Sequence, residues 1–305
     1  MGVKDIEEKQ LEDYNDVFAD IVNVIMFGGK QVVKEDELEN AKDKTRFKDV
    51  EGKVTEQERD VAKWWKKCKV RIALIGLENQ TKIDKNICFR LYGYDGAAYK
   101  SQYEEAIKYP VITLVLYFGY KERWNGTKSL CDSMEVPEPL SGFVNDYRMN
   151  LVELAWQTDE QVEMYKSDFK IVVDYLVQMR KHNGEYYPSK EEMKHIDAVL
   201  KMMSAMTGDE RFEEAQKTTR GEKGKVKNMC EALDRIVNRG IEKGRIEGRA
   251  EGRAEGRAEG RSEERKDFVI KMLKGNEPLE KIIEYSQLSE EEVLSLAKSL
   301  GLKVS

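Results

Sequence analysis

A β-rich apolar segment that ends in polar residues extends from Val70 to Asp84. Val, Ile and Leu dominate its first half, which predicts a largely buried β-strand. Side chains of a strand alternate between its two faces, so Glu78 and Gln80 share the face of Leu74. An acid and an amide are therefore expected to emerge together where this strand ends.

The segments around this strand predict an α/β arrangement. Leu11 to Phe27 has apolar residues at helical spacing and ends before Gly28, so we expect a core helix there. Val111 to Phe118 predicts a second buried strand, and Tyr94 to Tyr109 predicts a helix between the two strands, with Asp95 as its N-cap. A strand, a helix and a further buried strand predict a crossover with parallel pairing.

The segments on either side complete the predicted fold. Asn150 to Leu154 is expected to add one strand, and Gln161 to Met206 two amphipathic helices. The polar stretch from Gln31 to Gln57 is either a hairpin or an irregular excursion, and its strands cannot be placed. The expected fold class is α/β: a mixed sheet flanked by helices, followed by a helical C-terminal extension.

Residues 240–265 form a low-complexity repeat of Glu, Gly, Arg and Ala with a period of four. Four residues turn a helix by about 400°, so each residue type forms a slowly winding stripe. Interior glycines and like charges at i, i+4 weaken an isolated helix. The repeat is therefore either a coiled-coil contact between chains, with the Glu stripe against the Arg stripe, or a flexible spacer.

The pattern divides the chain into four parts. They are a domain at residues 1–206, a linker at 207–239, the repeat helix at 240–265 and a small helical tail at 266–305. A homo-oligomer formed through residues 240–265 is one consequence of the charge stripes.

Composition narrows the class of protein. The chain has 305 residues, of which 36% are charged, and a net charge of −6. No run reaches the ~18 apolar residues of a membrane span, and the charged N-terminus lacks the apolar core of a signal peptide, so we expect a cytoplasmic protein. Cysteines and histidines are too scattered for a zinc site. The negative net charge requires any DNA-binding surface to be local.

Candidate chemistry gathers between residues 49 and 80. Metal-dependent phosphodiester hydrolysis needs a second carboxylate that faces the first across a cation. Asp60 is the first candidate to face Glu78, because the intervening chain suffices for a short element and a turn, and Asp49 is the alternative. Each acid also fits a solvated surface position.

A basic, aromatic cluster lies between Asp60 and the strand. It either holds a phosphate backbone and stacks a base, or consists of solvated lysines that flank core tryptophans. Its members are Lys63, Trp64, Trp65, Lys66, Lys67, Lys69 and Arg71.

Several motifs, in order along the chain, carry a resemblance to a known family. They are N-D-V-F-A-D-I (15–21), E-R-D-V-A-K (58–63), G-L-E-N-Q-T-K-I-D (76–84), R-L-Y-G-Y-D-G-A-A-Y-K-S-Q (90–102) and Y-P-V-I-T-L-V-L-Y-F-G (109–119). Together they resemble the recombination-promoting nucleases and YhgA-like transposases, a family of the PD-(D/E)XK nuclease superfamily. The chain departs from the superfamily at the third motif residue, which is classically lysine and here is Gln80.

The resemblance implies a metal-dependent DNA endonuclease of the transposase or recombination-promoting type. Asp60 and Glu78 are expected to hold Mg²⁺, or Mn²⁺ in its place, together with the Asn79 carbonyl. Gln80 cannot take a proton as a lysine amine can, so it is expected to orient the attacking water through hydrogen bonds.

The resemblance also implies contacts around this centre. It suggests an acid, Asp16, near the active site, and a helix against the sheet from which Gln102 would contact metal-bound water or substrate. DNA is the expected partner. The remaining residues expected at its phosphates are Lys66, Lys67, Lys69 and Arg71.

Two other classes of function fit the same sequence. One is a catalytically weakened DNA-binding or transposition accessory protein that keeps the fold. The other is an oligomerising scaffold that acts through the repeat helix. Titration of Mg²⁺ against a DNA substrate distinguishes all three.

Overall fold

The computed structural model describes residues 11–41, 44–48, 54–58, 60–67, 70–220 and 226–302. The chain divides into two compact units, Met1–Ile236 and Val237–Ser305, and each is described by itself. Asp49 and Lys69, both candidate site residues, lie outside the described residues, as does the side chain of Arg71.

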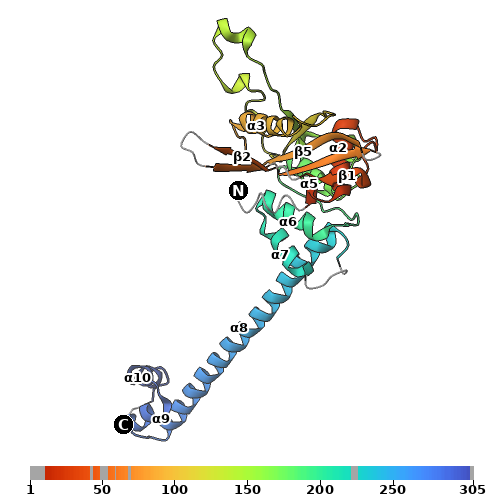
Figure 1. Ribbon diagram of the computed structural model, residues 1–305. Helices are drawn as coiled ribbons and strands as arrows, with labels where there is room; N and C mark the ends of the chain where they lie inside the picture. Colours follow the sequence, from red (N-terminus) through yellow and green to blue (C-terminus); the bar gives the residue numbers. More distant parts are fainter. Residues whose placement is uncertain are drawn as a thin grey trace. The chain divides into compact units, whose positions relative to one another are not determined.

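A five-stranded mixed sheet forms the centre of the first unit (Figure 1). Its order is β1-β4-β5-β6-β7, antiparallel from β1 to β5 and parallel from β5 to β7. The expected α/β class and the parallel pairing of the two buried strands are therefore confirmed. The strands are β1 (Leu38–Asn40), β4 (Val61–Lys67), β5 (Val70–Gln80), β6 (Val111–Tyr117) and β7 (Asn150–Glu153).

The polar stretch before β4 also contains a separate antiparallel hairpin. It is formed by β2 (Lys44–Lys48) and β3 (Val54–Glu58), whose register pairs Lys44 with Glu58. Of the two structures left open for this stretch, a hairpin is thus present.

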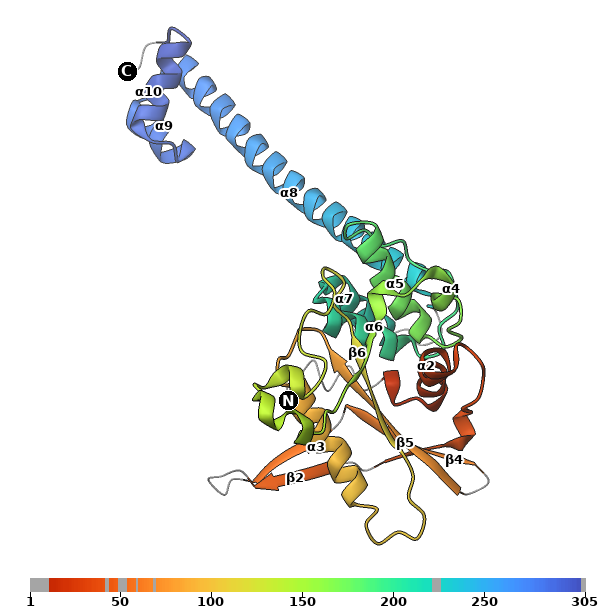
Figure 2. The same ribbon diagram turned by 90° about the horizontal axis from the view of Figure 1, so that it is seen from above.

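Helices cover both faces of the sheet. The elements are α2 (Asn15–Phe27), α3 (Ile87–Lys100), α4 (Asp159–Val162), α5 (Phe169–Lys181), α6 (Ile196–Thr207) and α7 (Glu210–Arg220), with short 3₁₀ turns η1 (Glu35–Glu37), η2 (Cys131–Ser133), η3 (Glu138–Phe143) and η4 (Leu154–Trp156). The side chains of Ile75 and Leu77 pack in the core with α2, α5 and α6. Leu74 packs in a separate cluster with Ala98 of α3. Alternation along β5 thus gives each face its own helices, and α2 and α3 lie on opposite sides of β5 (Figure 2).

Helix α3 begins earlier than the sequence predicted. It begins at Ile87 and ends at Lys100, so Asp95 is not its N-cap. Asp95 is buried in mid-helix, where its carboxylate accepts hydrogen bonds from Thr113 (2.7 Å) and Tyr147 (2.6 Å). The side chains of Ile87 and Leu91 are fully buried, and this burial extends the helix toward its N-terminus.

The segment expected as a linker, 207–239, contains regular structure. Gly208 ends α6 in a left-handed conformation (φ 65°), and α7 follows at once. Phe212 and Ala215 of α7 are buried in the main core of the first unit. The next helix, α8 (Met229–Lys274), begins before the end of this segment.

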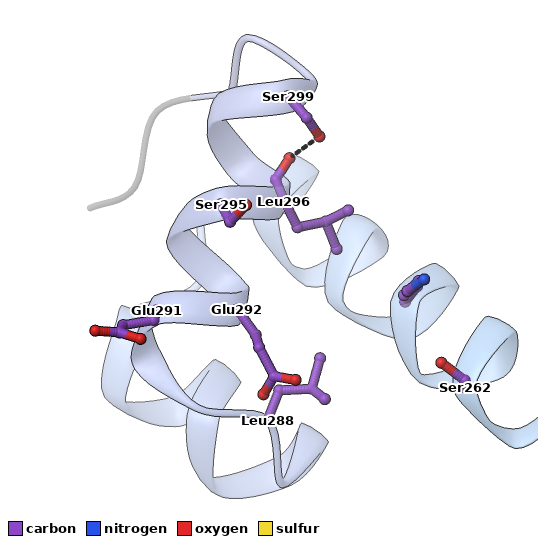
Figure 3. Close-up of a pocket in the computed structure, with 8 residues that line it drawn as sticks. Ser262, Leu288, Glu291, Glu292, Ser295, Leu296 and Ser299 are labelled. Carbon is purple, nitrogen blue, oxygen red and sulfur yellow. Dashed lines mark hydrogen bonds between the residues drawn. The ribbon is translucent and has the colours of Figure 1, made fainter.

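The second unit comprises most of α8, α9 (Leu279–Ser286) and α10 (Glu290–Ser299). Ser289 and Glu292 form the expected capping box at the start of α10. A pocket of about 440 Å³ lies between α8 and α10 (Figure 3). No helix in the described part of the chain is long and apolar enough to cross a membrane.

Candidate active site

The acid and the amide of β5 lie together, as the strand period predicted. The side-chain amide of Gln80 lies 3.4 Å from Oε1 of Glu78, so both side chains are on the face covered by α3. Glu78 is only 4% exposed, however, and is not the solvent-accessible acid expected at the end of a strand. Its burial arises because α3 packs over this face, and the charge is stabilised inside the fold.

Asp60 lies across the strand pair from Glu78. Val61 of β4 pairs with Leu77 of β5 in antiparallel register, and the residues one step further along are Asp60 and Glu78. Oδ2 of Asp60 accepts a hydrogen bond of 2.7 Å from the main-chain N–H of Asn79. This bond fixes the Asp60 carboxylate at the end of β5, beside the acid and amide.

Arg90 is the residue of this site that sequence reasoning missed. From the first turn of α3 its guanidinium donates to Oε1 of Glu78 at 2.5 Å and forms an ion pair with Asp84 at 3.2 Å. Burial lowers its pKa, but the charges of Glu78, Asp84 and Asp60 together with Tyr94 outweigh burial, and the pKa is raised. The signal was available in principle, because a helix beginning at Ile87 places Arg90 in its first turn.

Asn79 points away from this group. Its side-chain amide donates to Oε2 of Glu12 at 2.7 Å, and both side chains are buried. The Asn79 side chain is thus on the opposite face of β5 from Glu78, so toward the acid and amide Asn79 can offer only its main-chain carbonyl. Glu12 carries no distinguishing sequence signal, since it meets Asn79 only through the tertiary fold.

The donor set fits a hard cation such as Mg²⁺. Asp60 and Glu78 carry carboxylate oxygens, and the side-chain amide of Gln80 lies beside Glu78. Mg²⁺ is commonly held by one or two carboxylates together with waters and substrate phosphate oxygens. Within the described ranges no group of three His, Cys, Asp or Glu residues can hold a metal ion. Two carboxylates, one of them paired with Arg90, are a sparse donor set, so a cation here would have to take most of its ligands from water or substrate oxygens.

The basic, aromatic cluster on β4 is mostly structural. Lys63 is fully buried and its ammonium donates to the carbonyl of Asp13 and to the side chains of Asn15 and Asn40. Burial lowers its pKa, and the charge of Asp13 only partly opposes this. Lys63 is therefore a structural residue and not a surface contact for phosphates.

The other described members of the cluster include two structural tryptophans and two lysines nearer the surface. Trp64 packs edge-on against Tyr109 (4.7 Å between ring centroids), and Trp65 donates to Glu37 at 3.0 Å. These indoles are structural, as the alternative reading of the cluster allowed. Lys66 forms an ion pair with Glu39, which leaves Lys67 as its most exposed described lysine.

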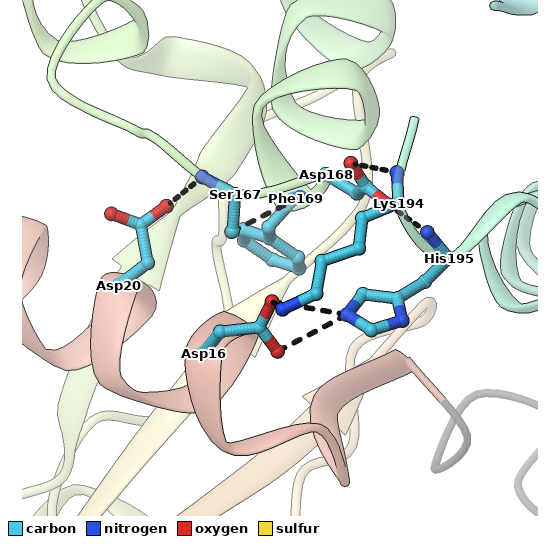
Figure 4. Close-up of polar contacts among 7 residues, drawn as sticks. All are labelled: Asp16, Asp20, Ser167, Asp168, Phe169, Lys194 and His195. Carbon is cyan, nitrogen blue, oxygen red and sulfur yellow. Dashed lines mark hydrogen bonds and ion pairs between the residues drawn. The ribbon is translucent and has the colours of Figure 1, made fainter. Parts of the chain in front are cut away.

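Asp16 belongs to a different cluster, away from the β5 site. Its carboxylate forms an ion pair with Lys194 (2.7 Å) and lies 3.0 Å from Nε2 of His195 (Figure 4). The His195 ring stacks on Tyr14, with 3.7 Å between ring centroids. Burial raises the pKa of Asp16, but the hydrogen bonds from Lys194 and His195 outweigh it and the pKa is lowered. Asp16 therefore lies apart from Glu78 and Gln80, and not beside them as the resemblance implied, because α2 covers the other face of the sheet.

Gln102 is buried and hydrogen-bonded within the fold. It is 1% exposed, its amide nitrogen donates to the carbonyl of Ala98, and its amide oxygen accepts the N–H of Tyr109. The amide closes the connection between α3 and β6. The geometry does not support the expected contact with metal-bound water or substrate, since both polar ends of the amide are used inside the fold.

These observations define a mixed α/β protein whose acid, amide and arginine side chains gather where β4, β5 and α3 meet. Residues 72–207 match the family model described as "Putative transposase, YhgA-like". The resemblance to YhgA-like transposases is thereby confirmed over that range, which includes Glu78, Gln80 and Arg90 but not Asp60. Comparison with curated proteins gave no match, and neither did comparison with solved structures.

Proposed function

We propose that this protein is a metal-dependent DNA endonuclease of the transposase or recombination-promoting type, with the PD-(D/E)XK arrangement. The observation that carries the proposal is the antiparallel register of β4 and β5, which sets Asp60 opposite Glu78 with Gln80 on the same face. The match of residues 72–207 to a transposase family supports DNA as substrate and a role in transposition or recombination.

Each side chain has its own chemical role in this proposal. Asp60, Glu78 and the Asn79 carbonyl would hold Mg²⁺ or Mn²⁺, which supplies Lewis acidity and lowers the pKa of a bound water. The main-chain N–H of Asn79 keeps the Asp60 carboxylate oriented. The Gln80 amide hydrogen-bonds the attacking water, and Arg90 contributes the positive charge that a lysine supplies at the position of Gln80.

Mg²⁺ titration with supercoiled plasmid DNA tests this function. Glu78→Gln and Asp60→Asn keep side-chain volume and hydrogen bonding but remove a charged ligand, so cleavage should fall by roughly 10²-fold or more. Glu138→Gln, an exposed acid in η3, is the matched control and should cleave normally. Circular dichroism shows whether each variant is folded, and equal cleavage by folded Glu78→Gln would refute the role of Glu78.

Two features favour a second function. Arg90 already neutralises Glu78, and the lysine of the classical motif is replaced by Gln80. Both features suit a catalytically weakened DNA-binding or transposition accessory protein. In the same titration this function predicts DNA binding that needs no divalent cation, together with no cleavage at any Mg²⁺ or Mn²⁺ concentration.

A further inference from the structure

The solvent face of α3 and of the turn after it is aromatic. Phe89, Tyr92, Tyr99 and Tyr103 are 45%, 56%, 51% and 83% exposed. At about 100° per residue, Phe89, Tyr92 and Tyr99 fall within one face of α3, and Tyr103 continues that line beyond the helix end. We call these four residues the α3 aromatic face. Large rings exposed in a row mark a binding surface, because isolated exposed apolar residues need no partner but contiguous ones do.

The charge of the part of this face that lies on α3 is suited to a polyanion. Lys85 lies at its start and Lys100 near its end, and both are exposed. Every residue of α3 is described, and its single acid, Asp95, is buried and hydrogen-bonded. A chain of net charge −6 therefore presents here a face without exposed acids on the helix. Beyond the helix end the exposed Glu104 and Glu105 follow Tyr103, so the charge favourable to phosphates is confined to the part of the face on α3 itself.

Two of the rings are held in place although they are exposed. Tyr92 lies edge-on against Tyr147, with 5.7 Å between ring centroids. The hydroxyl of Tyr99 accepts the N–H of Val111 at 3.2 Å. Gly96, between them, has open space where a Cβ would be, so no side chain fills the gap. Rings fixed in advance lose little conformational entropy when a flat ligand stacks on them.

We propose that the α3 aromatic face binds unpaired DNA bases by stacking, with Lys85 and Lys100 at the adjacent phosphates. Bases in a duplex already stack on each other, whereas unpaired bases leave their faces free for aromatic side chains. The same helix carries Arg90, so DNA held on α3 lies on the element that completes the candidate active site. The choice of DNA rests on the proposed function, which the inference extends to substrates with single-stranded segments.

Fluorescence anisotropy without divalent cations tests the inference on the full chain. A labelled single-stranded oligonucleotide is compared with the same sequence as a duplex. The double variant Tyr92→Ser/Tyr103→Ser should raise the Kd for the single strand by roughly 10-fold or more, since stacking contributes about 1–3 kcal/mol per base. The duplex Kd should change far less, and Tyr92→Phe/Tyr103→Phe should bind like wild type because the rings remain. Phe143→Ser, at a ring 86% exposed elsewhere, is the matched control and should also bind normally.

Three results would overturn the inference. The first is an unchanged single-strand Kd in the Ser variant, and the second is an equal loss of affinity for duplex and single strand. The third is a change of oligomeric state in light scattering, which would assign the face to a protein contact.

Plasmid cleavage is measured in a separate assay, so the inference and the proposed function can fail independently. If the wild-type protein cleaves plasmid DNA but the Ser variant binds the single strand with an unaltered Kd, only the inference is refuted. If the Ser variant loses single-strand binding but the wild-type protein never cleaves plasmid DNA, only the proposed nuclease activity is refuted.

Discussion

Arg90 is the single residue whose position most changes the chemistry of the candidate site. Gln80 cannot carry the charge of the classical lysine, and Arg90 brings a guanidinium to Glu78 from α3. We predict that Arg90→Gln lowers plasmid cleavage by roughly 10²-fold, a typical loss for a group that stabilises transition-state charge. Introducing Gln80→Lys into that variant should restore part of the activity, since it returns a cation to the same group.

The comparison of the two single variants with the double variant measures this coupling. Arg123→Gln serves as the control, because Arg123 is exposed and contacts Glu153 and Trp156 elsewhere on the sheet. If Gln80→Lys gives no recovery and the two losses simply add, then Arg90 does not replace the missing lysine.

Asp16 gives a pH-dependent prediction that is independent of activity. Its pKa is lower in the folded protein than in the unfolded chain, so its ionised form stabilises the fold above the unfolded pKa of about 3.9. That contribution is lost as pH falls through the folded pKa. Asp16→Asn should therefore reduce the free energy of unfolding at neutral pH, and the difference from wild type should shrink below about pH 4.

Urea unfolding at neutral and acidic pH measures this difference. Asp36→Asn, at an exposed acid in η1, is the matched control for a general loss of negative charge. A wild-type advantage that persists unchanged at acidic pH would show that the contacts of Asp16 with Lys194 and His195 do not depend on its ionisation.

What the sequence predicts at the residue scale depends on how local the signal is. The shared face of Glu78 and Gln80 follows from the two-residue period of a strand, and it is confirmed. The contact between Glu12 and Asn79 joins the approach to α2 with the end of β5, and no local period carries that information. Arg90 was missed for a related reason, since its role depends on where α3 begins.

Elements with one uniform apolar pattern were predicted well. β5, β6 and β7 and helices α5 and α6 lie close to their expected positions, because each buries a continuous face or stripe. α3 was placed too late, since its tyrosines and glycines obscure the helical period and an acid in mid-helix resembles a cap. The β2–β3 hairpin has no apolar face in its sequence, so periodicity could not assign it.

The strand β4 gives a prediction about DNA contacts at this scale. Lys66 is already paired with Glu39, whereas Lys67 is exposed at the end of the strand. Lys67→Ala should therefore weaken duplex binding and reduce the salt slope by roughly 0.9, the value for one phosphate contact. Lys66→Ala should change the slope less.

Binding isotherms at several salt concentrations give these slopes. Lys121→Ala, outside β4, is the control for a general loss of positive charge. Equal and unchanged slopes for both lysine variants would leave Lys66 and Lys67 as solvated charges with no phosphate contact.

At the scale of the whole molecule, the chain joins a folded α/β unit to a long helix whose sequence repeats. Helix α8 has 46 residues, and its repeat positions are exposed, with open space around glycines such as Gly248, Gly252 and Gly256. A helix that is polar all round needs many ion pairs or a partner to be stable. The residue pattern left both a helix and a flexible spacer open; the segment is helical, and whether another chain covers it is still a prediction.

We predict that deleting residues 244–261 converts a dimer or higher oligomer to a monomer, because the deletion removes the Glu and Arg stripes that would pair between chains. Raising the salt concentration on the intact protein should act in the same direction, since exposed ion pairs are screened over about 8 Å at physiological ionic strength. Light scattering at low and high salt measures both effects, and thermal unfolding should show that the first unit stays folded, because its core lies in Met1–Ile236. If the intact protein is already monomeric at low salt, the repeat acts only as a tether between the two parts of the chain. The scaffold function would then be excluded, and the activity would have to come from the site around Glu78.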